Sequence, residues 1–240
     1  HRVELFTTAS EIAEFRDAFV RPPQVTVLPF PRKRWPRADE IFASLHRGLI
    51  YNRRTDLIAK VGQLHPSETN AFKYWSYRAV FQPLSKIRPL RDLVRWLDFR
   101  MLPVVEYDEL FQKEKPALLF STNIMEFEDV QLAKAARRNG VPVIGMPKSW
   151  DNLSKTGFRV KPDRMIVWSP FMRDEARRFQ NIPADRVDIV GVPQFDSYAQ
   201  PDRLATREVF CREVGLDAKK RFILFGSEGK HTPRDAEVVQ

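Results

Sequence analysis

Short apolar runs of strand length alternate along this chain with segments in which apolar residues recur at helical spacing. The runs cover residues 3–8, 24–30, 117–122, 141–147, 165–169 and 187–193. The segments between several of them repeat apolar residues every three or four positions, as helices that cover a sheet do. Strands that alternate with helices predict a parallel sheet with crossover helices, so we expect an α/β fold of Rossmann-like type.

The helical segments between these runs have recognisable ends. Ser10 is a plausible N-cap for the first helix, and Gly140 follows residues 126–139 at the place where a left-handed C-terminal residue is expected. The expected helices cover residues 11–19, 41–50, 107–112, 126–139 and 171–179.

The stretch from Glu68 to Pro103 is helical in pattern and unusually aromatic and basic, and Pro83 and Pro89 divide it into shorter pieces. Its apolar positions alternate with Lys86, Arg88, Arg91, Arg95 and Arg100. A basic amphipathic stretch of this kind can lie on an anionic membrane surface. A helix that packs in the core and has an arginine-rich solvated face would show the same pattern, so both interpretations stay open.

The end of the chain has the pattern of a second unit. Residues 194–203 are polar and contain a proline, which is typical of a linker, and a helix over 206–216 and a strand over 221–229 are expected after it. We therefore expect an N-terminal Rossmann-like domain over residues 1–199 and the incomplete beginning of a C-terminal domain over 200–240. On this interpretation the sequence is a fragment of a longer polypeptide.

The composition is that of a globular protein with a positive surface. Forty Lys and Arg against 31 Asp and Glu give a formal net charge of +9, which favours anionic partners such as nucleotides, phosphorylated lipids or a membrane surface. The single cysteine, Cys211, excludes disulfides within the chain and cysteine-rich metal sites, and suits a reducing cytoplasm. No apolar run approaches the length that spans a bilayer, so we expect a cytoplasmic protein that is either free or peripheral at the inner face of the membrane.

Polar side chains gather directly after the apolar run 141–147. In open α/β sheets such loops at the ends of strands form the binding site. A carboxylate there can accept the proton of an attacking hydroxyl, and lysines can hold phosphate. The candidates are Asp151 as base, Lys148 and Lys155 as phosphate or acceptor contacts, and Ser149, Trp150 and Asn152 as further binding and loop-organising residues. A simple turn capped by Asp151 or Asn152 is the competing explanation.

A second candidate is the turn Gly226, Ser227, Glu228 and Gly229, which follows an expected strand and precedes a helical pattern. Small residues at such a turn let backbone N–H groups approach phosphate oxygens. The turn lacks the spacing of known phosphate-binding motifs, and a tight turn without a ligand explains it equally well.

The four histidines show neither the spacing of a metal pair nor the order of a catalytic triad, so no metal or cofactor is expected. Glu126 and Glu128 begin a helix after an expected strand and could face the same crevice as the loop around Asp151. The simpler explanation is that they interact favourably with the helix N-terminus.

The order of these elements resembles the glycosyltransferases of the GT-B fold. The resemblance rests on PDRMIVWSPFMRDEARRF, VDIVGVPQFDSY and RFILFGSEG and covers roughly Ala117 to Gly229. The loop PKSWDNLSKTG is similar to a segment of the CDP-glycerol glycerophosphotransferase-like and surface-carbohydrate enzymes, which reads approximately Q-x-W-H-G-x-x-x-K-x-x-G. Trp150, Lys155 and Gly157 match that segment, whereas Asp151 stands where those enzymes have a catalytic histidine.

The resemblance implies transfer of a sugar or alditol phosphate from a nucleotide-sugar or CDP-alditol donor to a glycan or lipid-linked acceptor, in bacterial-type surface polysaccharide or glycolipid synthesis. It also implies that the N-terminal domain receives the acceptor and that the turn at Gly226 to Gly229 belongs to the donor side. This chain would then bind a donor poorly by itself.

Two other functions remain possible at this point. A nucleotide-sugar 2-epimerase shares the architecture and would need carboxylates and a histidine that converge in the cleft. A non-catalytic protein of the same fold could instead bind an anionic membrane surface. No nucleic acid is expected, because no recognised binding motif is present.

Overall fold

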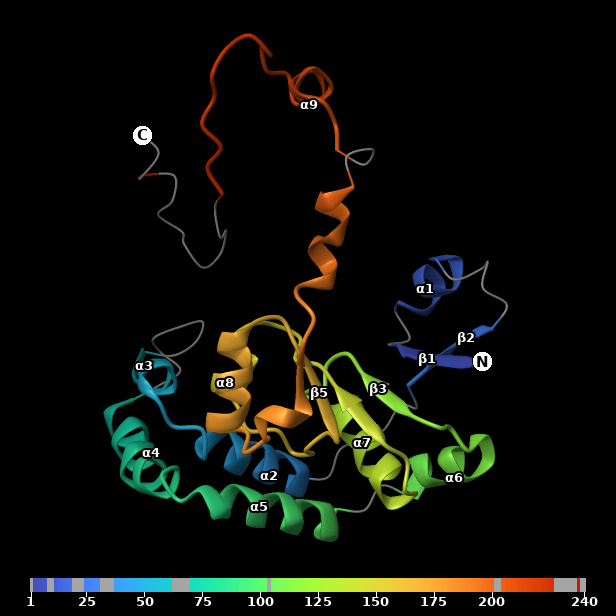
Figure 1. Ribbon diagram of the computed structural model, residues 1–240. Coiled ribbons are helices and arrows are strands. Elements are labelled where there is room, and N and C mark those ends of the chain that lie inside the picture. The colour runs from blue at the N-terminus through green and yellow to red at the C-terminus, as the bar shows by residue number, and fades with distance from the viewer. Residues whose placement is uncertain are drawn as a thin grey trace.

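A four-stranded parallel sheet forms the centre of the molecule (Figure 1). The computed structural model describes residues 2–7, 11–18, 24–30, 37–61, 70–102, 105–200, 204–226 and 237. The strands lie in the order of the chain and pair in parallel throughout: β3 (Leu119–Ser121), β4 (Val143–Gly145), β5 (Arg164–Val167) and β6 (Val187–Ile189). The expected α/β fold with a Rossmann-like parallel sheet is confirmed.

The N-terminal residues form a second, smaller parallel sheet. Strands β1 (Val3–Thr7) and β2 (Val25–Pro29) pair in parallel and are joined by helix α1 (Ile12–Ala18). Phe6 and Phe30 pack against the core of the main sheet, and Arg2 pairs with Glu114 at 3.4 Å. The expected βαβ unit is therefore present and contacts the main unit, although its strands do not pair with the main sheet among the described residues.

Two crossover helices, α7 (Phe127–Arg138) and α8 (Pro170–Phe179), connect β3 to β4 and β5 to β6. The Ser169 hydroxyl accepts a hydrogen bond from the backbone N–H of Met172, so it caps α8, and Pro170 fits the first turn because its missing N–H is not needed there. Gly140 follows α7 with φ +70°, as expected for a left-handed residue after a helix.

One face of the sheet is buried and the other is half open. On the buried face lie Val143, Met165 and Val167, with α7 and α8 packed over them. The opposite face presents Phe120, which is 49% exposed, and an exposed ion pair between Arg164 and Asp188.

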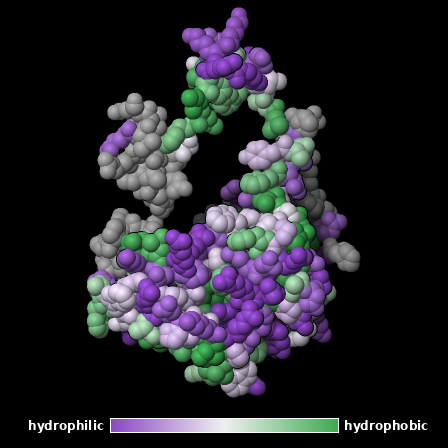
Figure 2. Space-filling view, turned by 60° about the vertical axis from the view of Figure 1, so that its left-hand side comes forward, coloured by the Kyte–Doolittle hydropathy of each residue, from purple (hydrophilic) through white to green (hydrophobic). Residues whose placement is uncertain are grey.

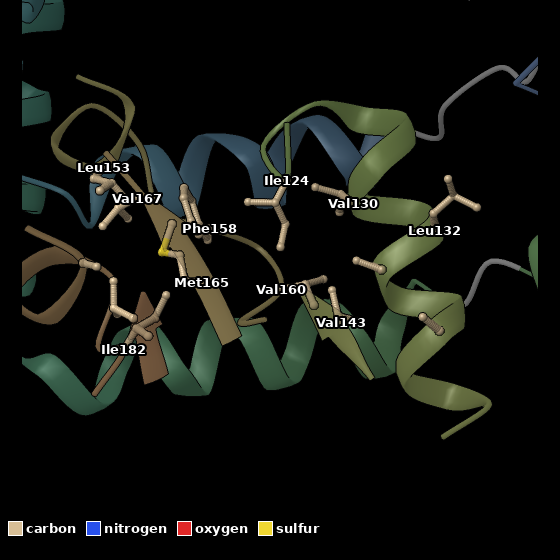
Figure 3. Packing of buried hydrophobic residues seen from close by; sticks show 14 of the residues in the cluster. Ile124, Val130, Leu132, Val143, Leu153, Phe158, Val160, Met165, Val167 and Ile182 are labelled. Carbon is tan, nitrogen blue, oxygen red and sulfur yellow. The ribbon is translucent and has the colours of Figure 1, made fainter. Parts of the chain in front are cut away.

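The connection from β4 to β5 contains no α-helix, only the 3-10 turn η2 (Asn152–Ser154). Figure 3 shows Phe158 and Val160 of this connection pointing into the core near Met165 and Val143. Helices α2 (Arg37–Gly48) and α5 (Arg88–Met101) pack on each other, and both bond to the connection: Gly157 N–H donates to the His46 carbonyl, and Arg95 Nε donates to the Phe158 carbonyl.

Helices α3 (Arg53–Val61) and α4 (Ala71–Leu84) pack on each other, and α6 (Val105–Glu114) packs on α7. Within the described residues, none of the helices has both the length and the apolar character that a bilayer span requires.

Helix α5 buries several charged side chains and exposes some of its apolar ones. Arg91, Arg95 and Asp98 are each at most 7% exposed, whereas Leu93 and Trp96 are about half exposed. The expectation that the arginines of this stretch form a solvated or membrane-facing surface is therefore wrong for Arg91 and Arg95. The physical reason is that carbonyls and charges from neighbouring segments satisfy these guanidinium groups inside the molecule.

Asp98 is the centre of a buried ionic cluster. Its carboxylate accepts hydrogen bonds from Lys134 Nζ at 2.6 Å and from Arg159 Nε at 2.7 Å, and His46 Nε2 lies 3.3 Å away. Burial alone would raise the pKa of Asp98, but the bonds from Arg159, the nearby His46 and the Lys134 charge hold it well below its usual range. Burial lowers the pKa of His46, which favours the neutral imidazole.

Arg91 donates hydrogen bonds to backbone carbonyls at the ends of three helices. Its guanidinium donates to the carbonyls of Leu49 after α2, of Ser85 after α4, and of Arg178 and Phe179 at the end of α8. These carbonyls have no partner within their own helices, and a cation is favourable at a helix C-terminus. One side chain thus fixes α2, α4 and α8 relative to α5.

The C-terminal part differs from expectation in two places. Residues Pro193–Ala199 of the expected linker form a 3-10 helix, η4, and the expected helix is present as α9 (Arg207–Glu213). Residues 221–226, expected to be a strand, form none, and Ile223 is 97% exposed. A strand needs a neighbouring strand for its backbone hydrogen bonds, and none lies beside this segment among the described residues. The boundary near residue 200 stays a prediction.

Replacement of Asp98 by alanine should lower the free energy of unfolding by ~3–5 kcal/mol, because it leaves the cation of Lys134 buried without its counter-ion and leaves Arg159 paired with Asp39 alone. The matched control is Asp188→Ala, whose ion pair with Arg164 is exposed and should contribute less than about 1 kcal/mol. Urea unfolding followed by circular dichroism measures both.

The difference between wild type and Asp98→Ala should also depend on pH in a defined direction. Because the folded pKa of Asp98 is depressed, its contribution is fully present above the unfolded value of about 4 and is lost only as the pH falls toward the folded value. Equal stability of the two proteins at neutral pH would contradict the proposed role of the cluster.

Candidate functional site

The loop of residues 148–157 begins just after the carboxyl end of β4 and is held by its own side chains. The Asn152 side-chain oxygen accepts a hydrogen bond from the Ser149 backbone N–H at 2.6 Å, which closes a local turn. Gln180, just after α8, donates to the carbonyls of Leu153 and Thr156. Asn152 and Gln180 thus hold the backbone of the loop, and the role of Asn152 in binding stays a prediction.

Asp151 forms ion pairs with two cations. Its Oδ2 accepts a hydrogen bond from Arg54 Nη2 at 2.7 Å and lies 2.5 Å from Lys155 Nζ. Burial alone would raise the pKa of Asp151, but the hydrogen bond and charge of Lys155, a hydrogen bond with Ser149 and the charge of Arg54 together lower it. The carboxylate is therefore ionised at neutral pH and is a weaker proton acceptor than an unperturbed aspartate.

Arg54 also lies against Trp150. Its guanidinium carbon is 5.2 Å from the centre of the indole ring, and the ring is 59% exposed. A cation over an aromatic face offers a stacking and charge surface to an anionic ligand. Lys148 is exposed at the start of the loop and forms no ion pair with Asp151.

The first turn of α3 positions Arg54. The Asn52 side-chain oxygen caps α3 by accepting hydrogen bonds from the backbone N–H groups of Arg54 and Thr55. The Asn52 amide donates to the Ser154 carbonyl at 2.7 Å. The same side chain therefore begins the helix and attaches it to the loop.

Glu175 on α8 is a second buried carboxyl group beside this loop. Burial raises its pKa, and the Asp151 charge adds to the effect, while a hydrogen bond with Ser154 and the Arg54 charge oppose it. Among the described residues nothing bonds to its Oε2 atom. A carboxyl group with a raised pKa beside an ionised one is the arrangement expected of a general acid or base.

Sequence reasoning missed Arg54 and Glu175. Arg54 is 97 positions from Asp151, and no local pattern connects them. Glu175 lies in the amphipathic pattern of α8 on the buried side, with Met172 and Ala176. The sequence could have indicated Glu175, because a glutamate on the apolar face of a helix is unusual.

A further acidic group lies at the carboxyl end of β3. The Ser121 hydroxyl donates to Asp129 Oδ1 at 2.5 Å. The pKa of Asp129 is raised to about 6. Burial is the main cause, the hydrogen bond with Ser121 opposes it, and the charges of Glu126 and Glu128 add to it.

Glu126 lines a cavity together with the end of the loop at Thr156 and Gly157, whereas neither Glu128 nor Asp151 is part of its lining. The cavity has a volume of about 230 Å³, and its lining includes Arg47, Glu126, Thr156 and Arg159. A larger hollow of about 600 Å³ lies at the opposite end of the sheet, next to Gly140, away from these side chains.

The second predicted turn is described only at its first residue. Gly226 is exposed with open space around its Cα position, and Ser227, Glu228 and Gly229 lie outside the described residues. Their assignment to a donor phosphate stays a prediction. Within the described part of the chain no three His, Cys, Asp or Glu side chains gather as ligands for a metal ion.

Replacement of Gly157 by alanine should destabilise the protein by ~1–3 kcal/mol, because a Cβ there would lie 2.6 Å from the His46 carbonyl oxygen and push the loop away from α2. Gly226→Ala is the matched control and should change the stability by less than about 0.5 kcal/mol, since its Cβ would meet open space. Thermal unfolding measures both, and a neutral Gly157→Ala would contradict the close contact of the loop with α2.

Asp129 should titrate with a midpoint of about 6, well above an ordinary aspartate, which carbon-13 NMR of its carboxyl group can follow. Removal of the Ser121 hydroxyl in Ser121→Ala should raise the midpoint further, because the hydroxyl bonds to the charged form. A midpoint near 4 in the wild type would refute the burial of this carboxyl group.

Comparison with known proteins finds no protein-family model, no curated protein and no solved structure that matches the chain. The family resemblance therefore has no support beyond the residues that suggested it. The function has to be argued from the loop around Asp151 and the side chains that the fold brings to it.

Proposed function

We propose that this chain is the acceptor-side part of a GT-B-type glycosyltransferase. It would transfer a sugar or alditol phosphate from a nucleotide-activated donor to a hydroxyl group of a glycan or lipid-linked acceptor. The observation that carries the proposal is the cluster of Arg54, Asp151, Lys155 and Glu175, located where a Rossmann-like sheet offers its binding edge.

In this proposal the two carboxylates have different roles. Glu175, whose pKa is raised, takes the proton of the acceptor hydroxyl as that oxygen forms its new bond and the donor's bond to the leaving phosphate breaks. Asp151, whose pKa is lowered, stays ionised and keeps Arg54 and Lys155 in position. Asp151 thus becomes a positioning residue, although the sequence favoured it as the base.

The cations suit an anionic substrate. Arg54 and Lys155 are both about one-third exposed, so a phosphate could reach them from solvent and share them with Asp151. Trp150 beside Arg54 offers an exposed ring against which a sugar or a lipid-linked group could pack. The net charge of +9 supports the same substrate class.

A nucleotide-sugar 2-epimerase is the second candidate. The observation that favours it is the group of carboxyls at the start of α7, where Glu126 lines a cavity together with Thr156 of the loop. Such an enzyme would alter the donor sugar without any acceptor, whereas a transferase needs the acceptor.

The test is a transfer assay of the full-length protein that contains this chain, with UDP-, GDP-, CDP- and CMP-activated donors and with glycan and lipid-linked acceptors. Glu175→Gln should lower kcat by about a hundredfold or more with little change in KM, because it removes the proton acceptor and keeps the shape. Asp151→Asn should mainly raise KM, since it frees the two cations from their fixed positions. Asp188→Asn, on the far side of the sheet, is the control.

Each outcome distinguishes the candidates. Release of nucleotide that requires an acceptor supports a transferase, and conversion of the donor without an acceptor supports the epimerase. Absence of both reactions with every donor would refute both enzymes. A kcat that falls with Asp151→Asn and not with Glu175→Gln would return the role of base to Asp151.

A further inference from the structure

The outward face of α4 is apolar. Phe72 and Trp75 are 83% and 60% exposed and lie three positions apart, which places them on one side of the helix, and Val80, further around the helix, is 50% exposed. Exposed aromatic and aliphatic residues occur singly on most soluble proteins, whereas a continuous row of them marks an interaction surface.

Helix α5 also exposes apolar side chains, while several of its charged side chains are buried. Leu93 and Trp96 point outward and are 50% and 54% exposed, while Arg91, Arg95 and Asp98 are buried against α2, α7 and α8. Figure 1 shows α4 and α5 following one another along the lower edge of the molecule, and Figure 2 shows hydrophobic and hydrophilic residues intermixed along that edge. The exposed side chains of these two consecutive helices are together called the α4–α5 face.

The charges of this region are predominantly positive. Residues 70–102 contain seven Lys or Arg residues and two Asp residues. Of the two aspartates, Asp98 is buried, and Asp92 pairs with Arg95 and with Lys161. Asp92 is nevertheless exposed, and the other exposed charges of residues 70–102 are cations, notably Lys86, Arg88 and Arg100.

Each exposed tryptophan has an arginine about one helical turn further along. The guanidinium of Arg78 lies 5.6 Å from the ring of Trp75, and that of Arg100 lies 5.9 Å from the ring of Trp96. At a membrane surface, tryptophan rings lie at the level of the headgroups and arginines bind their phosphates. The repeated pair combines both properties on each helix.

We propose that the α4–α5 face docks on an anionic lipid bilayer, with the apolar row inserted among the headgroups and the cations bound to lipid phosphates. The positive charge of the α4–α5 face favours an anionic bilayer over a second copy of the chain as its partner. Two copies joined through this face would bring like charges together, which disfavours association, whereas an anionic leaflet neutralises them. The inference rests on this surface alone and does not depend on the proposed transferase.

Sedimentation with lipid vesicles tests the proposal. The protein should bind vesicles of phosphatidylcholine mixed with phosphatidylglycerol and bind much more weakly to phosphatidylcholine alone, and added salt should weaken the binding because it screens the charges. The double variant Trp75→Ser/Trp96→Ser should reduce binding to the mixed vesicles by at least about tenfold, since it removes two rings whose apolar surface would be buried among the headgroups. Lys86→Gln/Arg88→Gln/Arg100→Gln should reduce binding and its dependence on salt.

Phe120→Ser is the matched control, because Phe120 is a similarly exposed aromatic residue on the open face of the sheet. Circular dichroism and thermal unfolding show whether each variant keeps the fold. The proposal is overturned if the wild type binds neither kind of vesicle, or if a folded Trp75→Ser/Trp96→Ser variant binds as well as wild type. Dimers in solution that dissociate in this variant, without any vesicle binding, would instead identify the face as a protein interface.

Discussion

The buried charge on α5 is the constraint on which the arrangement of this fold depends. Asp98 is fully buried, so it can stay ionised only if cations surround it, and Lys134 from α7 and Arg159 from the β4–β5 connection supply them. Arg91 and Arg95 on the same face in turn bind carbonyls of α8 and of that connection. Because charges need specific partners while apolar groups do not, these contacts fix the position of α5 over the part of the sheet where a crossover helix is missing.

The same contacts hold the candidate site. The β4–β5 connection that supplies Arg159 begins with the loop around Asp151, so any shift of α5 or α8 is transmitted to that loop. Gln180 fixes its backbone, and Gly157 allows it to approach the His46 carbonyl closely. The polar side chains at the carboxyl end of β4 therefore rest on a rigid support, which a binding site requires if it is to hold its groups in one geometry.

The sequence predicted the elements well and their tertiary partners poorly. Strands and crossover helices follow from local patterns, and Gly140 takes the predicted conformation for a reason contained in its own neighbourhood. The pairing of Arg54 with Asp151 joins residues 97 positions apart, which no period or spacing encodes. The arginines of α5 show the same limitation. Their spacing predicts that they lie on one face of the helix, but it does not predict whether that face is buried or exposed. The segment 221–226 has strand composition and forms no strand, because pairing depends on a neighbour as well as on propensity.

The pKa of Asp151 is lowered and that of Glu175 is raised, because both cations pair with Asp151. Arg54 and Lys155 bond directly to Asp151, so their charges outweigh its partial burial. For Glu175 the effect of burial outweighs the Ser154 hydrogen bond and the Arg54 charge that oppose it, and the charge of Asp151 raises its pKa further. Ionisation of one carboxyl group thus favours the protonated form of the other. A ligand phosphate that drew Arg54 and Lys155 away from Asp151 would lessen this difference, so substrate binding and proton transfer in this cluster are expected to be coupled.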